Sequence, residues 1–195
     1  MQASELFKQS NTILLDGGMG TMLQAAGLKL GARPEELNIT DPALIEGIHA
    51  LNPRLTALLP EGSAFKIYAG MREEYSRDGQ RILPTRDVRL ARRMVRDHKF
   101  RGHSLEKTFS MWPAVCEGED KNIKVFKPEA DLLLDTSFSY EVCCLAPFVT
   151  ALRGELAPGM PYAAQLESLC SRFALCMPLP EQSIPRTSML REFIG

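Results

Sequence analysis

The segment DPALIEGIHALNPRLTALLP, residues 41–60, constrains the fold most because it fits either a helix or a strand. As a helix, it begins at Asp41 with Pro42 in the first turn. The apolar stripe of that helix consists of Leu44, Ile45, Ile48 and Leu51. As a strand, residues 43–46 form the buried end of a sheet, and Glu46 carries a carboxylate at its end. The rest of the chain decides between these two structures.

Short apolar runs alternate with helical patterns along the rest of the chain. Strand-like runs occupy residues 13–15, 64–70, 122–126 and 130–137. Helical patterns occupy residues 86–101, 104–112, 138–154 and 161–176, with Pro113 expected to stop the second of them. Residues 71–85 are polar and rich in turn-forming residues, so we expect a loop there. Strands that alternate with helices predict an α/β sheet protein.

Composition places the chain among ordinary globular proteins, with 195 residues, 45% hydrophobic and 24% charged. The formal net charge of −1 gives no general reason to expect nucleic acid or an anionic membrane as partner. The first fifteen residues do not have the pattern of a signal peptide, and no apolar run approaches the roughly 20 residues of a membrane span. The five cysteines are an odd number without framework spacing, which favours a reduced cytoplasmic location.

The helix RDVRLARRMVRDHKFRG is the strongest local feature. Its residues Arg89, Arg92, Arg93 and Arg96 have the spacing of one helical face. The segment from residue 86 to residue 107 carries eight basic and three acidic side chains in an almost neutral protein. One interpretation is a solvated charged face paired with Asp97 and Glu106. The other is a lid of arginines that closes over polyphosphate, since arginine binds phosphate in bidentate fashion.

Two other motifs do not complete a known site. The glycines of DGGMGT do not form a P-loop, which requires G-x-x-x-x-G-K-[ST], and a tight strand-to-helix turn explains them better. Cys143 and Cys144 are adjacent, but their flanks in YEVCCLAP indicate a buried helix, where cysteine is commonly a small apolar side chain. A zinc site is therefore not expected. The three histidines do not have the spacing of metal ligands.

Residues 13–45, ILLDGGMGTMLQAAGLKLGARPEELNITDPALI, resemble the opening of homocysteine S-methyltransferases and methionine synthase homocysteine domains. That family begins a (β/α)8 barrel with a strand ending in D-G-G-M-G-T, a helix and a RPEELN connection. The resemblance implies a strand, a turn and a helix that begins at Thr21. The family's zinc cysteines lie in G-x-N-C and G-G-C-C segments, and this chain contains neither.

Residues 44–195 resemble bacterial nucleoside kinases of the uridine kinase and phosphoribulokinase family. The segments that carry the resemblance, in family order, are IEGIHALNP, FKIY, TRDVRLARRMVRDHKFRGHS, MWPAV, GEDKNI, EAD and SMLREFIG. It matches Arg93, Arg96 and Arg101 to lid arginines that contact ATP and substrate phosphates, and Glu46 to an acidic residue near the nucleotide and magnesium. We therefore expect Arg93 and Arg96 to serve catalysis, and Arg92, Arg101 and Glu46 to bind phosphate or ATP.

Together the resemblances imply a chimera: a methyltransferase-like segment at 1–43 and a nucleoside-kinase-like part at 44–195. The expected fold is an incomplete P-loop-kinase-like parallel sheet with helices, preceded by a strand, turn and helix of barrel type. On this basis we favour the strand at residues 43–46. The expected partners are ATP with Mg²⁺ and a nucleoside or nucleotide, with no nucleic acid and no membrane.

The parent family's P-loop lies in the region that methyltransferase-like sequence replaces here, so phosphoryl transfer is expected to be impaired. The alternatives are a homocysteine S-methyltransferase-related fragment and a non-catalytic fusion or interaction protein. Because each parental sheet has lost neighbours, a homo-oligomer or a partner chain is expected to cover exposed core.

Overall fold

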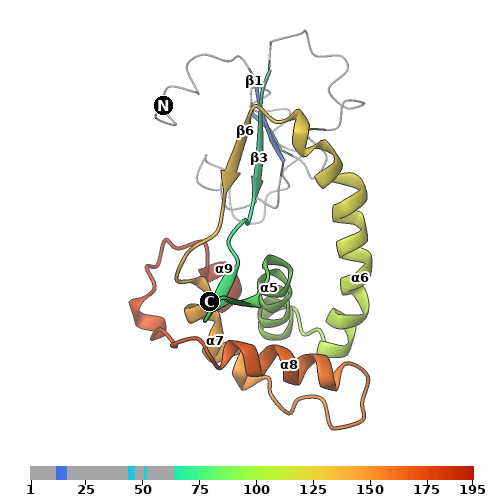
Figure 1. Cartoon of the computed structure of the whole chain (residues 1–195), viewed down its shortest axis with the longest axis vertical. Helices are drawn as coiled ribbons and strands as arrows, with labels where there is room; N and C mark the ends of the chain where they lie inside the picture. The colour runs from blue at the N-terminus through green and yellow to red at the C-terminus, as the bar shows by residue number, and fades with distance from the viewer. Residues whose placement is uncertain (1–11, 17–43, 47–50, 52–63) are drawn as a thin grey trace. The chain divides into compact units, whose positions relative to one another are not determined.

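The computed structural model describes residues 12–16, 44–46, 51 and 64–195 (Figure 1). The chain divides into two compact units. Unit 1 comprises Met1–Gly70 and Cys116–Thr136, and unit 2 comprises Met71–Val115 and Ser137–Gly195. The protein is mixed α/β, with a small parallel sheet in unit 1 and most of its described helices in unit 2.

The sheet of unit 1 contains four parallel strands in the order β2-β1-β3-β6, three of which Figure 1 labels. The strands are β1 (Thr12–Asp16), β2 (Leu44–Glu46), β3 (Ala64–Gly70) and β6 (Leu132–Asp135). The strand predictions at 13–15, 64–70 and 130–137 are confirmed, with β6 shorter than expected. The ambiguous segment is a strand at residues 44–46, as favoured, and the remainder of that prediction falls outside the described residues except Leu51.

The register of the sheet joins strands from the two segments with different resemblances. Leu15 of β1 lies opposite Glu46 of β2 and Ile67 of β3. On the other side of β3, Asp131 fixes the start of β6, because its side chain accepts from the Lys66 amide at 2.8 Å and its own amide donates to the Lys66 carbonyl at 2.9 Å. The chain therefore builds one continuous sheet across the predicted boundary at 43/44.

The strand predicted at residues 122–126 is wrong. Helix α6 (Leu105–Asn122) ends there, and a 3₁₀ helix, η2 (Lys124–Glu129), follows. The alternating apolar residues Ile123 and Val125 suggested a strand, but the Val125 side chain is exposed. Lys124 instead forms ion pairs with acidic residues of the preceding helical turn, with Asp120 at 3.2 Å and with Glu119 at 3.5 Å.

Residues 71–85 contain a β-hairpin, so the loop predicted there is wrong. Strands β4 (Tyr75–Arg77) and β5 (Gln80–Leu83) pair antiparallel. Asp78 and Gly79 turn the chain with φ angles of 52° and 75°, which is the backbone of a tight two-residue hairpin turn. Most side chains of the hairpin face solvent, and this is why its sequence looked like a polar loop.

The helices of unit 2 are α5 (Thr85–Phe100), α7 (Glu141–Ala151), α8 (Ala163–Phe173) and the short α9 (Arg191–Ile194). These positions confirm the helices predicted at 86–101, 138–154 and 161–176, each with shorter or slightly shifted ends. The proline-punctuated tail contains only a turn of 3₁₀ helix, η3 (Glu181–Ser183), before α9. None of the helices in the described ranges combines the length and apolar content that a membrane crossing requires.

The core of unit 2 forms where α5 packs against α7 and α9, and α7 against α8. The apolar stripe of α5 faces this core, because Val88, Ala91 and Val95 are buried. The other fully buried large side chains of unit 2 include Leu83, Met94, Leu145, Leu166, Leu169, Phe173, Leu190 and Ile194. This core holds α5 in place and thereby determines where its arginines lie.

Helix α6 continues past Pro113, so the stop predicted there is wrong. A proline inside a helix removes one backbone hydrogen bond and crowds the preceding turn, which usually ends or kinks the helix. Here Pro113 is exposed, while Leu105 and Phe109 on the same helix are buried in the core of unit 2. Burial of that apolar face stabilises the helix on the N-terminal side of the proline.

Candidate functional site

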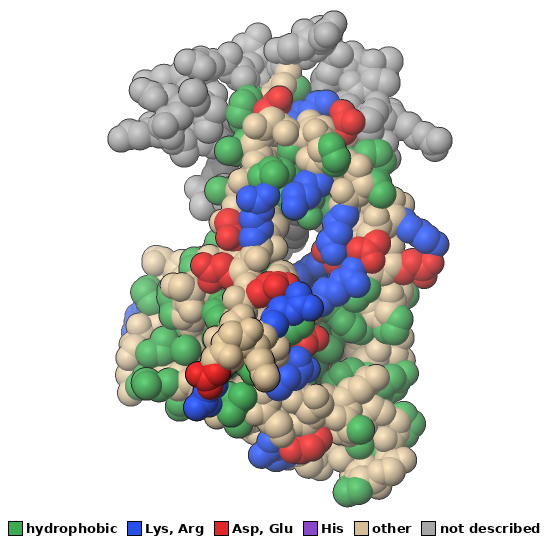
Figure 2. All heavy atoms as spheres, viewed as in Figure 1, with side chains coloured by type: hydrophobic (Ala, Val, Ile, Leu, Met, Phe, Trp, Pro, Cys, Tyr) green, Lys and Arg blue, Asp and Glu red, His purple; other side chains and the backbone are tan. Residues whose placement is uncertain are grey.

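The arginines of α5 have different partners, although their spacing predicts one face. On the face of unit 2 shown in Figure 2, Lys and Arg side chains lie beside Asp and Glu side chains. The question for each arginine is therefore whether another part of the protein already neutralises it. By this criterion, Arg92 differs from Arg93, Arg96 and Arg101.

Arg92 is bound to Glu141, the first residue of α7. The Arg92 Nε donates to Glu141 Oε1, and Nη2 donates to Oε2 at 2.5 Å. The Glu141 side chain is completely buried, and that of Arg92 is 16% exposed. The guanidinium also stacks on Phe193, with Cζ 5.0 Å from the ring centroid. Arg92 thus has an internal structural partner, and its predicted role in ATP binding stays a prediction.

Arg96 and Arg101 converge on one buried carboxylate, that of Asp97. The Arg96 Nε lies 3.0 Å from Asp97 Oδ1, and the Arg101 Nη1 lies 3.3 Å from the same oxygen. The ring of His103 approaches the other oxygen, with Nδ1 at 3.9 Å. Glu192 adds a longer contact to Arg96 at 3.8 Å. Asp97 holds both guanidinium groups in place. Its single negative charge does not balance their two positive charges.

Arg93 lies beside this pair without a carboxylate of its own. In the part of the chain that the structure describes, no acidic oxygen lies within ion-pair distance of its guanidinium, which sits 5.9 Å from the Trp112 ring centroid. Burial, followed by repulsion from Arg96, lowers the pKa of Arg93; attraction to Asp97 offsets part of this shift, and repulsion from Arg89 and Arg101 adds to it. Burial and repulsion express the same physical situation: a partly desolvated cation surrounded by other cations. We call Arg93, Arg96 and Arg101 the arginine cluster.

An anion at the arginine cluster would relieve this repulsion. Guanidinium groups donate hydrogen bonds in a planar fork that matches a phosphate or a carboxylate. Arg101 is 51% exposed, so solvent reaches the cluster. The cluster therefore combines fixed donors, excess positive charge and access.

Glu46 ends strand β2 in unit 1, opposite Leu15 in the register. The arginine cluster belongs to unit 2. The predicted role of Glu46 near nucleotide and magnesium therefore stays a prediction.

Three of the five cysteines, Cys144, Cys170 and Cys176, lie in surroundings that favour the neutral thiol. Burial raises the pKa of the Cys144 thiol to about 11, and the neighbouring Cys143 adds to the rise. Burial also raises the pKa values of Cys170 and Cys176. Since the thiolate is the form that binds metal, these environments disfavour metal binding at neutral pH. Among the described residues, no three His, Cys, Asp or Glu side chains gather into a group that could hold a metal ion.

Sequence reasoning did not assign a role to two residues that shape this site, Glu141 and Trp112. Glu141 is the one acidic residue of the otherwise apolar helix α7, at its first position, and such an isolated charge is a signal for a buried ion pair. Trp112 is the chain's only tryptophan. Nothing in its spacing from Arg93 indicates their contact, because the two residues lie on different helices.

Fold and site together define a mixed α/β protein with a candidate anion-binding cluster on one helix. Comparison of the chain with protein-family models, with curated proteins and with solved structures finds no match. The function is therefore argued from the arginine cluster and from the sequence motifs.

Proposed function

We propose that the chain binds a phosphate-bearing small molecule, a nucleotide such as ATP with Mg²⁺, through the arginine cluster. The observation that carries this proposal is Arg93, a partly buried guanidinium without a carboxylate partner among the described residues. A surface arginine that only solubilises the protein is normally exposed or paired. A desolvated arginine among other arginines is costly unless an anion offsets the repulsion.

We further propose that the chain is a chimera in which residues 44–195 derive from the uridine kinase and phosphoribulokinase family. The support comes from the sequence motifs of that family and from β2, which is a strand at the position where the kinase resemblance requires one. The 195 residues contain no P-loop motif. Binding without efficient phosphoryl transfer is the expected activity, and a partner chain with a P-loop lysine would be needed to restore transfer.

The test is calorimetric titration of the purified protein with Mg-ATP. Saturable binding is expected, and Arg93→Ala or the double variant Arg93→Ala/Arg96→Ala should weaken it by roughly tenfold or more, because a charged hydrogen bond is lost. Arg93→Lys, which keeps the charge but not the fork, should retain part of the affinity. Inorganic triphosphate with Mg²⁺ should bind as well if phosphate is the recognised group.

Arg153→Ala is the matched control. Arg153 also lies in unit 2 but is exposed and already paired with Glu167 at 3.1 Å. The proposal fails if Mg-ATP does not bind to wild-type protein whose folding is confirmed by circular dichroism. It also fails if Arg153→Ala weakens binding as much as Arg93→Ala, since binding would then follow net charge alone.

A further inference from the structure

An exposed apolar segment follows helix α8 in unit 2. In the part of the chain that the structure describes, Met177 is the most exposed of the large apolar side chains, at 80%, and Leu175 is half exposed. Pro178 and Pro180 are also exposed. Contiguous apolar surface of this kind marks an interaction site. We call Leu175, Met177, Pro178 and Pro180 the apolar ridge.

The apolar ridge has a fixed backbone. The amide of Leu179 donates to the Cys143 carbonyl of α7 at 3.0 Å, and the partly buried Leu179 side chain packs against the core of unit 2. Pro180 has φ −60° and ψ 136°, which is polyproline II geometry. A preformed segment loses little conformational entropy on binding, and polyproline II segments dock in grooves lined by aromatic side chains. The ridge thus has a conformation that an aromatic groove recognises.

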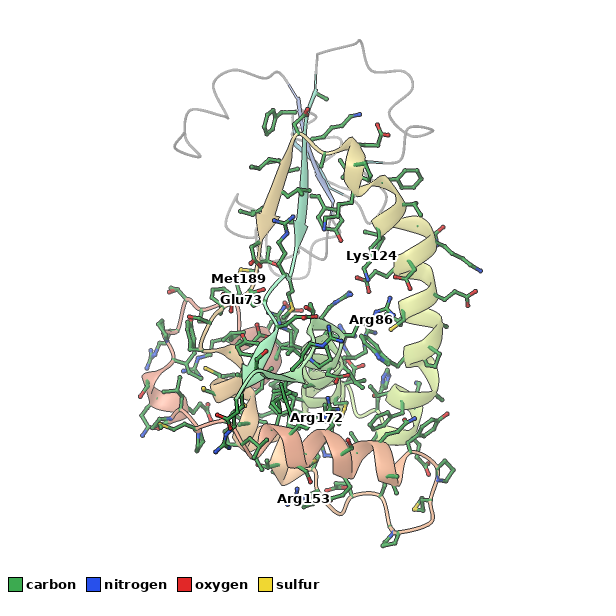
Figure 3. The ribbon with its side chains drawn as sticks, in the orientation of Figure 1. Glu73, Arg86, Lys124, Arg153, Arg172 and Met189 are labelled. Carbon is green, nitrogen blue, oxygen red and sulfur yellow. The ribbon has the colours of Figure 1, made fainter. Side chains whose placement is uncertain are left out.

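Unit 2 also contains a cavity of about 450 Å³ between α5, α6 and α8. Phe109, Trp112 and Tyr162 line it, and the rings of Phe109 and Tyr162 stack with their centroids 5.5 Å apart. Arg172, labelled in Figure 3, lines the cavity with its charge already matched, because it binds the Asp87 carboxylate. Aromatic surface beside an internally neutralised ion pair suits an uncharged apolar occupant.

The charges beside the ridge and beside the cavity are complementary. Glu181 follows the ridge directly, and its side chain is 52% exposed. One of its oxygens accepts from Arg191 at 3.2 Å, and the other has no partner among the described residues. At the cavity, Arg93 lies over the Trp112 ring. An apolar segment followed by a carboxylate therefore matches an aromatic cavity with a guanidinium beside it.

We propose that the apolar ridge of one copy of this chain docks in the cavity of a second copy. Methionine packs well on aromatic rings, because its thioether is flexible and polarisable. The ridge lies outside the cavity of its own chain, and the Leu179–Cys143 hydrogen bond holds it there. Helix α8 lines the cavity, and the ridge begins just beyond the end of that helix. Antiparallel α8 helices in two copies place each ridge beside the other cavity, which gives a closed dimer.

Sedimentation velocity of the full chain over a range of concentrations tests the dimer. The wild type should dimerise reversibly. Met177→Asp should raise the dissociation constant about tenfold or more, because docking would bury an unpaired carboxylate. Met160→Asp is the matched control, since Met160 is another exposed methionine of unit 2 but lies outside this cavity. It should leave the dissociation constant unchanged.

Three results would overturn the proposal, each on protein whose folding is confirmed by circular dichroism. The wild type stays monomeric at every concentration, the Met177→Asp variant dimerises like the wild type, or Met160→Asp weakens the dimer as much as Met177→Asp. The last result would mean that any added negative charge on unit 2 opposes association.

Fluorescence of Trp112 tests the cavity side of the contact, because the chain's only tryptophan lines the cavity. A capped peptide of residues 177–182, MPLPEQ, is titrated into the Met177→Asp protein, whose own ridge no longer competes. The emission should change saturably, and the peptide with aspartate in place of methionine should bind about tenfold more weakly or less. A peptide that leaves the emission unchanged overturns the cavity as the docking site.

Dimerisation and the proposed nucleotide binding fail separately. If Mg-ATP does not bind by calorimetry, the dimer is still expected, and a monomeric wild type leaves the Mg-ATP result standing. If both occur, Mg-ATP competes with Glu181 for Arg93 and raises the dissociation constant of the dimer, and Glu181→Gln removes this effect. A dimer that is unchanged by saturating Mg-ATP would overturn the contact between Glu181 and Arg93.

Discussion

Arg92 and Glu141 form an ion pair that is almost completely shielded from water. Removing one partner from such a pair leaves an uncompensated buried charge, which costs roughly 3–5 kcal/mol. Arg92→Met should therefore lower the free energy of unfolding by about this amount. The double variant Arg92→Met/Glu141→Leu should recover most of the loss, because both charges are then replaced by apolar groups.

Urea unfolding followed by circular dichroism measures all three proteins under one condition. A double variant as unstable as Arg92→Met would contradict this interpretation, because the loss would then come from packing and not from the unpaired Glu141. The same measurement bears on function: if Arg92→Met still binds Mg-ATP like wild type, the internal role of Arg92 is separate from the arginine cluster.

At the residue scale, sequence reasoning found the arginines but not their partners. The periodicity of α5 located Arg92, Arg93 and Arg96 correctly, because helix spacing is a local property. It did not separate Arg92 from Arg93. That difference depends on Glu141, 49 residues further along the chain, and on Trp112 of another helix. Tertiary contacts of this kind leave no trace in local spacing.

At the scale of elements, glycine-to-alanine substitutions test the β4–β5 hairpin and helix α6, because each of these elements contains a glycine in a different backbone conformation. Gly79 has a φ of 75° in the β4–β5 turn, whereas Gly118 lies inside α6, and neither has a neighbouring atom where a Cβ would stand. Gly79→Ala should destabilise the protein by about 1–2 kcal/mol through backbone strain. Gly118→Ala should stabilise it by up to about 1 kcal/mol through helix propensity.

Thermal unfolding of both variants gives the sign of each change. Asp78→Asn is the control for the turn, because asparagine adopts the left-handed conformation as readily as aspartate and should leave stability unchanged. If both alanine substitutions destabilised the protein, backbone conformation would not determine the sign of the two stability changes. The tight turn at Asp78 and Gly79 would then be contradicted.

The same contrast explains which elements the sequence predicted. Helix α5 and strand β3 were found because each has a complete apolar pattern of its own period, next to clear boundary residues. The hairpin was missed because most of its side chains are exposed to solvent, so its strands do not alternate apolar with polar residues. Helix α6 was predicted to end at Pro113 because the local effect of proline was given more weight than burial of the helix face that carries Phe109. In both cases tertiary context, not local propensity, determined the outcome.

At the scale of the whole molecule, the chain divides into two compact units, and each contains buried apolar side chains among its described residues. Unit 2 contains a large cluster of buried side chains that includes Leu145, Leu166 and Phe173. In the described part of unit 1, Leu51, Ile67, Tyr68 and Ala69 are buried, and Phe65 and Leu132 pack against Ile67. Compact units of this kind can open separately, each with its own free energy of opening.

We therefore expect the amides of β3 and those of α7 to exchange with solvent through separate openings, each with its own free energy. Native-state hydrogen exchange measured by mass spectrometry, at increasing denaturant, compares the two elements in one experiment. Leu145→Ala, a cavity-forming change in unit 2 that costs roughly 2–5 kcal/mol, should lower protection in α7 and leave β3 unchanged. Equal opening free energies, lowered together by Leu145→Ala, would instead show that the two units unfold as one. In that case the sheet depends on the helical core, and ligand binding at the arginine cluster would stabilise β3 as strongly as α5.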